Sequence, residues 1–268
     1  MKPNRFNQVR SEGRVPVGQM LWESGSRGMA RMMDACDLDF AIIDTEHAAF
    51  SSAQVADLIA WFSATTIAPF VRVTEIAYHL LARTMDAGAL GVMVPNVKNA
   101  AEARAIVDAV KYAPLGKRGI GLGGALTGYR GVNPAEFLEY SNANTTVMCQ
   151  IESVDGIENL EAIATTTGVD VLWVGHYDLS QSMGIPGRFH DERFRDNLKR
   201  VIAVCNQHNL GAGIQPGSIE QAQEWLETGF NVISYSTEMA VYLSAMTQAV
   251  QQVRALATGR HTEEMMNG

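Results

Sequence analysis

The sequence has little cysteine and no long apolar run, and both absences exclude classes of protein. Its 268 residues contain three cysteines, which stand far apart at Cys36, Cys149 and Cys205. We expect neither a disulfide framework nor a cysteine zinc site, and we predict buried thiols because each cysteine lies in an apolar segment. No apolar run approaches the roughly 20 residues that a membrane helix needs, and the polar first residues lack a signal-peptide core. The prediction is a cytoplasmic protein with no membrane partner.

Positive charge is also in short supply. Lys and Arg number 21 against 29 Asp and Glu, which gives a net charge of −8. Nucleic acids attract basic surfaces, so no nucleic-acid partner is expected. The lysines are Lys2, Lys98, Lys111, Lys117 and Lys199. Only Lys98 lies near the end of a predicted strand, and it stands where the next helix begins. A Schiff-base mechanism needs a lysine within the site, so the sequence argues against one.

β-rich segments alternate with amphipathic helical segments eight times along the chain. We predict strands over 17–24, 40–46, 67–74, 91–97, 145–153, 169–178, 211–218 and 231–238. We predict helices over 51–65, 77–89, 99–113, 156–168, 191–209 and 219–229. Several strands are continuously apolar, as strands covered on both faces must be. The pattern predicts one α/β domain over residues 1–268, a (β/α)8 TIM barrel with a short polar lead and a frayed C-terminal tail. An open doubly wound sheet is less consistent, because no nucleotide-binding fingerprint follows the first strand.

Polar side chains gather where the predicted strands end, which is the catalytic end of such a barrel. They are Glu23, Asp44, Glu46, His47, Arg72, Asn96, Gln150, Glu152, Asp178 and Gln215. Packing alone would favour apolar residues at inward positions, so this cluster predicts a chemical site.

Two of these carboxylates are candidate metal ligands. Gln150 and Glu152 are two residues apart on one strand and share a face. Asp178 ends the next predicted strand, so it should approach Glu152. Two facing carboxylates either share a proton or bind a cation, and oxygen ligands suit a hard or borderline divalent ion. The alternative is an ion-pair network that closes the barrel end.

His47 and Arg72 are candidates for catalytic roles. An imidazole at a strand end among carboxylates suits a general acid or base, although a lone histidine is more often structural. Arg72 could stabilise an enolate oxygen or bind a carboxylate. It could equally be the ionic partner of Asp44 or Glu46. Asp86, late in the predicted helix over 77–89, reads on its own as a solvated or capping acid.

A series of short segments resembles the HpcH/HpaI family of metal-dependent pyruvate aldolases, in the same order and over nearly the whole chain. The segments are IIDTEHA from Ile42, PFVRV around Arg72, MDAGALGVMVP from Met85, the APLGKRG turn, CQIES around Glu152 and GHYDLSQSMG from Gly175. Each segment is weak alone, whereas their order and spacing together are specific.

The resemblance implies a role for each candidate residue. Glu152 and Asp178 hold the metal, and His47 acts as the base. The 2-oxo acid is held by Arg72, Gln150 and the backbone next to Asp178, at Gly175 and Tyr177. Arg72 also stabilises the transition state. Asp86 raises the basicity of His47 across a subunit boundary, a role that the residues alone did not suggest.

The family further implies a class II aldolase that uses Mg²⁺, Mn²⁺ or Co²⁺. It would cleave a 4-hydroxy-2-oxo acid of the 2-keto-3-deoxy type, reversibly, to pyruvate or a related 2-oxo acid and an aldehyde, in aromatic or sugar acid catabolism. The implied assembly is a homo-oligomer, a hexamer built as a trimer of dimers, with the C-terminal helix exchanged between subunits. An oxaloacetate decarboxylase, a CoA-thioester lyase or a non-catalytic barrel that binds 2-oxo acids stays open as an alternative.

One departure from the family concerns the wall of the site. Many relatives have Pro and then a small residue where this chain has His176 and Tyr177. The bulkier wall means that the family's best-known substrates do not transfer directly. His176 could instead be an extra acid or base, or a neighbour of the metal.

Overall fold

Eight parallel strands close into a barrel in the computed structural model, which describes the backbone of residues 1–266 and the side chains of residues 1–257. The strands are β1 (Val17–Leu21), β2 (Phe40–Asp44), β3 (Ala68–Arg72), β4 (Gly91–Val94), β5 (Thr146–Ile151), β6 (Val171–Val174), β7 (Gly211–Ile214) and β8 (Val232–Thr237). Each strand pairs with the next in sequence, and β8 pairs with β1. The predicted (β/α)8 barrel is confirmed.

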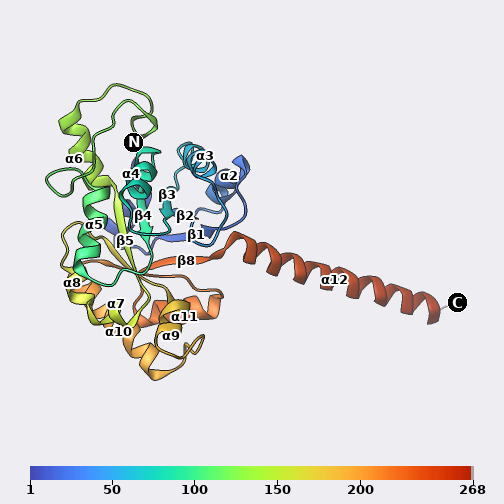
Figure 1. Cartoon of the computed structure of the whole chain (residues 1–268). Helices are drawn as coiled ribbons and strands as arrows, with labels where there is room; N and C mark the ends of the chain where they lie inside the picture. The colour runs from blue at the N-terminus through green and yellow to red at the C-terminus, as the bar shows by residue number, and fades with distance from the viewer. Residues whose placement is uncertain (267–268) are drawn as a thin grey trace.

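Helices surround the strands (Figure 1). They are α1 (Arg5–Ser11), α2 (Arg27–Ala35), α3 (Ser52–Phe62), α4 (Tyr78–Asp86), α5 (Ala100–Val110), the 3-10 turn η1 (Ala125–Thr127), α6 (Pro134–Asn144), α7 (Val154–Glu158), α8 (Leu160–Ala164), α9 (His176–Ser182), α10 (Glu192–Gln207), α11 (Ile219–Thr228) and α12 (Glu238–Met266). Side-chain caps set several helix starts. The Ser51 hydroxyl accepts a hydrogen bond from Gln54 N, and the Gln54 side-chain oxygen accepts one from Ser51 N, which together form a capping box.

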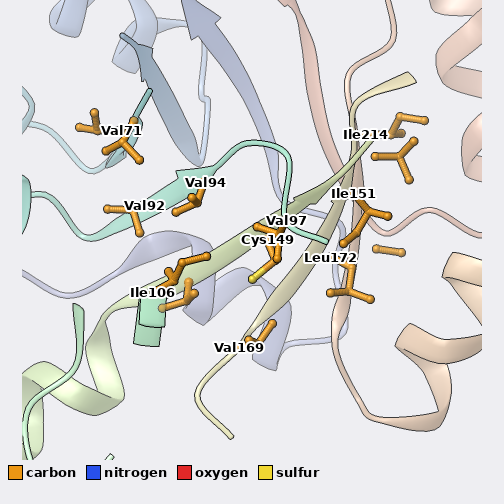
Figure 2. Close-up of a cluster of buried hydrophobic side chains, with 14 of the residues drawn as sticks. Val71, Val92, Val94, Val97, Ile106, Cys149, Ile151, Val169, Leu172 and Ile214 are labelled. Carbon is orange, nitrogen blue, oxygen red and sulfur yellow. The ribbon is translucent and has the colours of Figure 1, made fainter. Parts of the chain in front are cut away.

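The strands place their apolar side chains alternately inside and outside the barrel. The inner cluster includes Met93 and Met148, whereas Val92 and Cys149, one residue along, belong to the outer cluster beneath the helices. Figure 2 shows this outer cluster, where Ile106 of α5 lies against the strands. Burying an aliphatic side chain contributes about 1.5–3 kcal/mol, so these two layers supply most of the driving force for folding.

The cysteine prediction is confirmed in two of three cases. Cys149 and Cys205 are free and buried, but Cys36 is exposed. Cys36 follows the last residue of α2 and precedes Asp37, whose φ of 56° turns the chain away from the helix. Met33, three residues earlier, is buried against the barrel, while the position after the helix end faces solvent.

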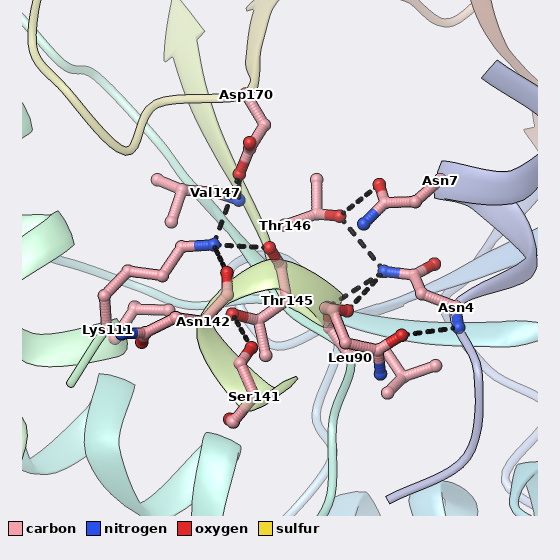
Figure 3. Close-up of polar contacts among 12 residues, drawn as sticks. Asn4, Asn7, Leu90, Lys111, Ser141, Asn142, Thr145, Thr146, Val147 and Asp170 are labelled. Atoms are coloured by element: carbon pink, nitrogen blue, oxygen red, sulfur yellow. Dashed lines mark hydrogen bonds and ion pairs between the residues drawn. The ribbon is translucent and has the colours of Figure 1, made fainter. Parts of the chain in front are cut away.

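The polar N-terminal lead forms a plug. Phe6 of α1 enters the barrel and packs edge-on against Phe40 and Phe70, with ring centroids 5.3 and 5.2 Å away. Figure 3 shows the polar contacts around it, where Asn4 Nδ2 donates to Thr146 Oγ1 at 3.1 Å. The amino-terminal end of the barrel is therefore closed.

The last helix departs from the barrel. α12 projects away from it (Figure 1), and every side chain from Ala240 to Ala257 is exposed. Exposed apolar residues recur on it at alternating steps of three and four: Leu243, Met246, Val250 and Val253. The backbone is helical to Met266 where a frayed tail was expected, and 267–268 lie outside the described residues. Along the described part of the chain, no helix is both long and apolar enough to cross a membrane.

Candidate active site

The open end of the barrel holds an arginine between two carboxylates. Asp44 and Arg72 are the last residues of β2 and β3 and stand opposite each other in the register. Arg72 donates through two nitrogens to the two oxygens of Asp44, both at 2.8 Å, and its third nitrogen lies 3.1 Å from Glu46 Oε2. Asp44 is fully buried and Arg72 is 6% exposed. The bidentate pair fixes the guanidinium plane at the base of the mouth.

Glu152 directly follows β5 and is buried. Its Oε1 accepts from Asn96 N at 2.6 Å, and its Oε2 accepts a short hydrogen bond from Gln150 Nε2. Burial raises the pKa of Glu152 to about 7, and the charges of Glu46 and Asp178 add to the increase. Burial likewise raises the pKa of Glu46, and Asp178 contributes there too. The carboxylates of Glu46, Glu152 and Asp178 are therefore close enough to repel one another.

Asp178 lies on a helix and not at a strand end, so the predicted strand over 169–178 is wrong at its C-terminal part. β6 ends at Val174, and α9 begins at His176 with Asp178 in its first turn. An acid in the first turn followed by buried Leu179 and Ser180 is typical of a helix start, because the helix N-terminus favours negative charge. The shift keeps Asp178 at the mouth, where it lines the cavity.

The residue between β6 and α9 has to be glycine, because a side chain at position 175 would collide with Glu152. A Cβ at this position would stand 2.8 Å from Glu152 Cβ and 2.9 Å from Gln150 Nε2. The backbone thus passes directly over the two side chains that the sequence analysis placed on one face. The Gln150 carbonyl oxygen Oε1 is buried and has no partner among the described residues.

A cavity of about 460 Å³ opens over these groups. It is lined by Trp22, His47, Arg72, Gln150, Trp173, Val174, Gly175, His176, Tyr177, Asp178, Gln215, Pro216, Gly217, Gln221, Ser236, Thr237, Met239 and Ala240. Glu152 is not a lining residue, but it accepts a hydrogen bond from Gln150, which is one. None of the five lysines lines this cavity, in agreement with the argument against a Schiff base.

His47 stands at the rim of the cavity. Its side chain is 49% exposed, and Nε2 lies 3.8 Å from Glu46 Oε2. Its ring packs against that of Trp22 at a centroid distance of 6.0 Å. Backbone bonds from Glu46 and His47 to the Asp44 carboxylate, at 3.0 and 3.3 Å, fix the turn that carries the imidazole.

Asp86 is the one predicted site residue that lies elsewhere. It ends α4, half-exposed, and pairs with the buried Arg118, which stacks on Tyr112. It does not line the cavity within one chain. Its role across a subunit boundary stays a prediction.

The sequence reasoning missed Trp22 and Trp173 as cavity residues. Trp22 directly precedes Glu23, which was noted at the strand end, so its position one residue after β1 was the available signal. Trp173 lay within an apolar strand and gave no signal that distinguished it from core.

His176 and Tyr177 form an aromatic wall on one side of the cavity. The His176 ring packs between Tyr177, Phe189 and Trp225 at centroid distances of 4.6, 5.0 and 5.0 Å. Burial lowers the pKa of His176 to about 4, so this imidazole is neutral near pH 7. That environment suits packing and does not suit the extra acid or base considered from the sequence.

The carboxylates could hold one hard divalent ion. The described residues contain no group of three or more His, Cys, Asp or Glu placed to bind a metal. Mg²⁺, however, is commonly bound through one or two carboxylates, with water and substrate completing its shell. The mutual repulsion at Glu152 and Asp178, together with the unpartnered Gln150 Oε1, fits such an ion and its substrate.

Comparison with known proteins decides the family. A family model described as HpcH/HpaI aldolase/citrate lyase matches residues 19–245. The chain belongs to the HpcH/HpaI aldolase/citrate lyase family. It is therefore an enzyme of the aldolase and lyase type.

Individual members of the HpcH/HpaI family match along most of their length. Hydroxypyruvate/pyruvate aldolase of Paraburkholderia phytofirmans is 31% identical over 248 residues, covering 88% of this chain and 92% of that protein. 2-Dehydro-3,6-dideoxy-6-sulfogluconate aldolase of Pseudomonas putida is 32% identical, covering 86% and 89%. The crystal structure of an HpcH/HpaI aldolase from Desulfitobacterium hafniense superposes with a TM-score of 0.88 at 27% identity, covering 92% and 96%. Sequence and fold thus agree on the family.

Proposed function

We propose that the chain is a divalent-metal-dependent aldolase that cleaves a 4-hydroxy-2-oxo acid to pyruvate, or a related 2-oxo acid, and an aldehyde. The observation that carries the proposal is the buried Glu152 carboxylate, which lies near Asp178 and beside Gln150 at the open end of the barrel. Relatives named hydroxypyruvate/pyruvate aldolase, 2-dehydro-3,6-dideoxy-6-sulfogluconate aldolase and 2-keto-3-deoxy-L-rhamnonate aldolase support the substrate class.

Glu152 and Asp178 would hold the ion, which when bound withdraws electron density from the 2-oxo carbonyl. Tyr177 lies in the first turn of α9, where backbone N–H groups have no partner within the helix, so its N–H is available for the substrate carboxylate, whereas the N–H of Gly175 donates to the carbonyl of Ile151 at 3.2 Å. Gln150 lines the same cavity, and its amide Nε2, which donates to Glu152 Oε2, carries the N–H groups that it can offer to the substrate.

His47 would accept the proton of the 4-hydroxyl group. The bond between carbons 3 and 4 then breaks, its electron pair stays on carbon 3 of the enolate, and the aldehyde leaves. Arg72, fixed by Asp44, would stabilise the negative charge that develops on the oxygen. In the reverse direction the same groups join pyruvate to an aldehyde.

The test of this proposal is a panel assay of pyruvate with assorted aldehydes, with and without Mg²⁺, Mn²⁺ or Co²⁺, before and after chelation. We expect activity that chelation abolishes and added metal restores. Binding of pyruvate without cleavage or metal-dependent exchange of its methyl protons would instead indicate a non-catalytic barrel.

His47→Ala tests the base separately from the rest of the site. We expect cleavage to slow by about 100-fold or more, while pyruvate affinity changes little. Loss of CO2 from oxaloacetate leaves the same enolate without removing a hydroxyl proton, so any such side activity should persist. A variant that only binds pyruvate more weakly would contradict the assignment of His47.

We also propose that the chain functions as a homo-oligomer, a hexamer assembled as a trimer of dimers, with α12 exchanged between subunits. The exposed apolar series on α12 and the half-exposed Asp86 support this assembly. The mass of the chain in solution, with and without residues 241–268, tests it. A monomeric full-length chain would contradict the proposal, and the assignment of Asp86 to a partner's His47 with it.

A further inference from the structure

We propose that Glu238 is a positioning residue for the cleavage reaction, which holds the loop after β1 so that Trp22 supports His47. The inference rests on the proposed function and adds a residue to it. Glu238 is the first residue of α12 and stands 191 positions from His47 in the sequence (238 − 47).

The Glu238 carboxylate accepts hydrogen bonds from the backbone N–H groups of three consecutive residues. Its Oε1 accepts from Glu23 N and Ser24 N, both at 2.7 Å, and its Oε2 accepts from Trp22 N at 2.9 Å. The side chain is 6% exposed. Backbone donors converging on a buried carboxylate make strong, charge-assisted bonds, so the loop has one well-defined position.

The Glu238 carboxylate does not cap the helix to which it belongs. An acid in the first turn often interacts with the N–H groups of that turn, yet at the start of α12 Ala240 N donates to Thr237 Oγ1 at 3.2 Å. Glu238 instead crosses to the loop after β1. By contrast, Glu192 in the first turn of α10 is exposed.

Trp22 links Glu238 to the proposed base, His47: its backbone N–H donates to Glu238, and its ring packs against the imidazole. Trp22 lines the cavity, and its ring lies 6.0 Å from that of His47 with an interplanar angle of 66°. Among the described residues, the ionic contact of the half-exposed imidazole is Glu46 at 3.8 Å, too long to fix its orientation. Packing against Trp22 therefore restricts the ring, and Glu238 holds Trp22 in place.

Glu238→Gln is the first test. The amide retains the volume but offers one acceptor oxygen and turns an NH2 group towards backbone donors. We expect kcat for metal-dependent cleavage to fall about 10- to 100-fold, since a displaced catalytic group is sufficient for such a loss. The KM for the 2-oxo acid should stay within about twofold, because the metal ligands, Gln150 and Arg72 are untouched.

A second readout follows the loop without turnover. The emission of Trp22, obtained as the difference between a protein and its Trp22→Phe partner, should shift to longer wavelength in Glu238→Gln as the indole gains solvent. Glu192→Gln is the matched control and should change neither kcat nor emission.

Trp22→Ala provides an independent route should Glu238→Gln not fold. It removes the contact with His47 but leaves the three backbone bonds, and we expect the same loss of kcat at constant KM. Combining it with Glu238→Gln should add nothing, because both act through one contact.

Three results would overturn the inference: wild-type kcat in Glu238→Gln, a parallel loss of kcat and 2-oxo acid binding, or additive effects in the double variant. If the wild-type chain shows no cleavage with any metal, the proposed function itself fails. The wild-type assay therefore separates that failure from the failure of the role of Glu238, which only the variants test.

Discussion

At the closed end of the barrel Lys111 donates to the carbonyl of Asn142 at 2.8 Å and to that of Thr145, with Asp170 3.7 Å away (Figure 3). At the open end one arginine faces several carboxylates. Arg72 is paired with Asp44 and Glu46, and burial raises the pKa of both Glu46 and Glu152. Both ends bury charge, but the open end holds more carboxylates than its one arginine can pair.

The difference separates stability from chemistry. A buried charge whose donors are satisfied contributes to a fixed structure, whereas surplus negative charge raises the free energy of the folded protein unless a cation is present. Barrels of this type place their chemistry at the C-terminal ends of the strands, and the uncompensated charge lies there.

The largest expected effect is on catalysis at the open end. Glu152→Gln and Asp178→Asn should each lower metal-dependent turnover by more than about 100-fold, because losing a direct ligand exceeds the 10- to 100-fold cost of losing an outer partner. The melting temperature without metal should not fall, since each change removes a repelled charge. A steady-state assay measures the turnover, and thermal unfolding of the metal-free proteins measures the melting temperature. Full activity in either variant would refute the metal site.

A change at the closed end should lower stability and leave catalysis unchanged. Lys111→Met leaves two buried carbonyls and Asp170 without their cation, and we expect a loss of about 3–5 kcal/mol in the free energy of unfolding. Folded protein should keep the wild-type kcat. Urea unfolding measures the loss, with the exposed Lys117→Met as the matched control. A change in kcat without loss of stability would break the contrast between the two ends.

The pH dependence of metal-free protein should reveal the open end. The folded pKa of Glu152, about 7, is above its ordinary value of 4.5, so the folded state binds the extra proton. Stability from this group therefore decreases as pH rises from 4.5 to 7, by about 2.5 kcal/mol. The slope should be absent in Glu152→Gln and reduced by saturating Mg²⁺. An identical pH profile in wild type and variant would contradict the raised pKa.

The smallest effect concerns the aromatic wall and has the opposite sign. The folded pKa of His176, about 4, is below its ordinary 6.5, so the unfolded chain binds the proton more readily. Acidification from pH 6.5 to about pH 5 should cost about 1.5 kcal/mol through this group. His176→Phe keeps an aromatic ring and should remove that dependence. Unfolding curves of both proteins at the two pH values measure this loss, and an equal loss in wild type and variant would contradict the role of His176.

The fold was predictable because its signal is local and repeated. Continuous apolar strands and amphipathic helices recur along the chain, and all eight strands were placed from them. Errors arose where a local pattern continued past the end of an element. The apolar run from Val169 gave no sign that the strand stops at Val174, since helix α9 also buries its first residues.

The site was predictable in part for the same reason. Glu152 and Gln150 share a face by strand periodicity alone, and Arg72 is the last residue of its strand. Asp86 shows the limit, because one chain places it with Arg118 and away from the cavity.

By itself the sequence determined the barrel, the shared face of Gln150 and Glu152 and the gathering of acidic residues where the strands end, since periodicity and strand order dictate all three. The tertiary structure decided which charges are matched. The pairing of Arg72 with Asp44, the close passage of Gly175 over Glu152 and the reach of Glu238 to the loop after β1 join residues far apart in sequence. The first two contacts join neighbouring strands, whereas the contact of Glu238 depends on barrel closure, which brings β8 beside β1 and which no local pattern records.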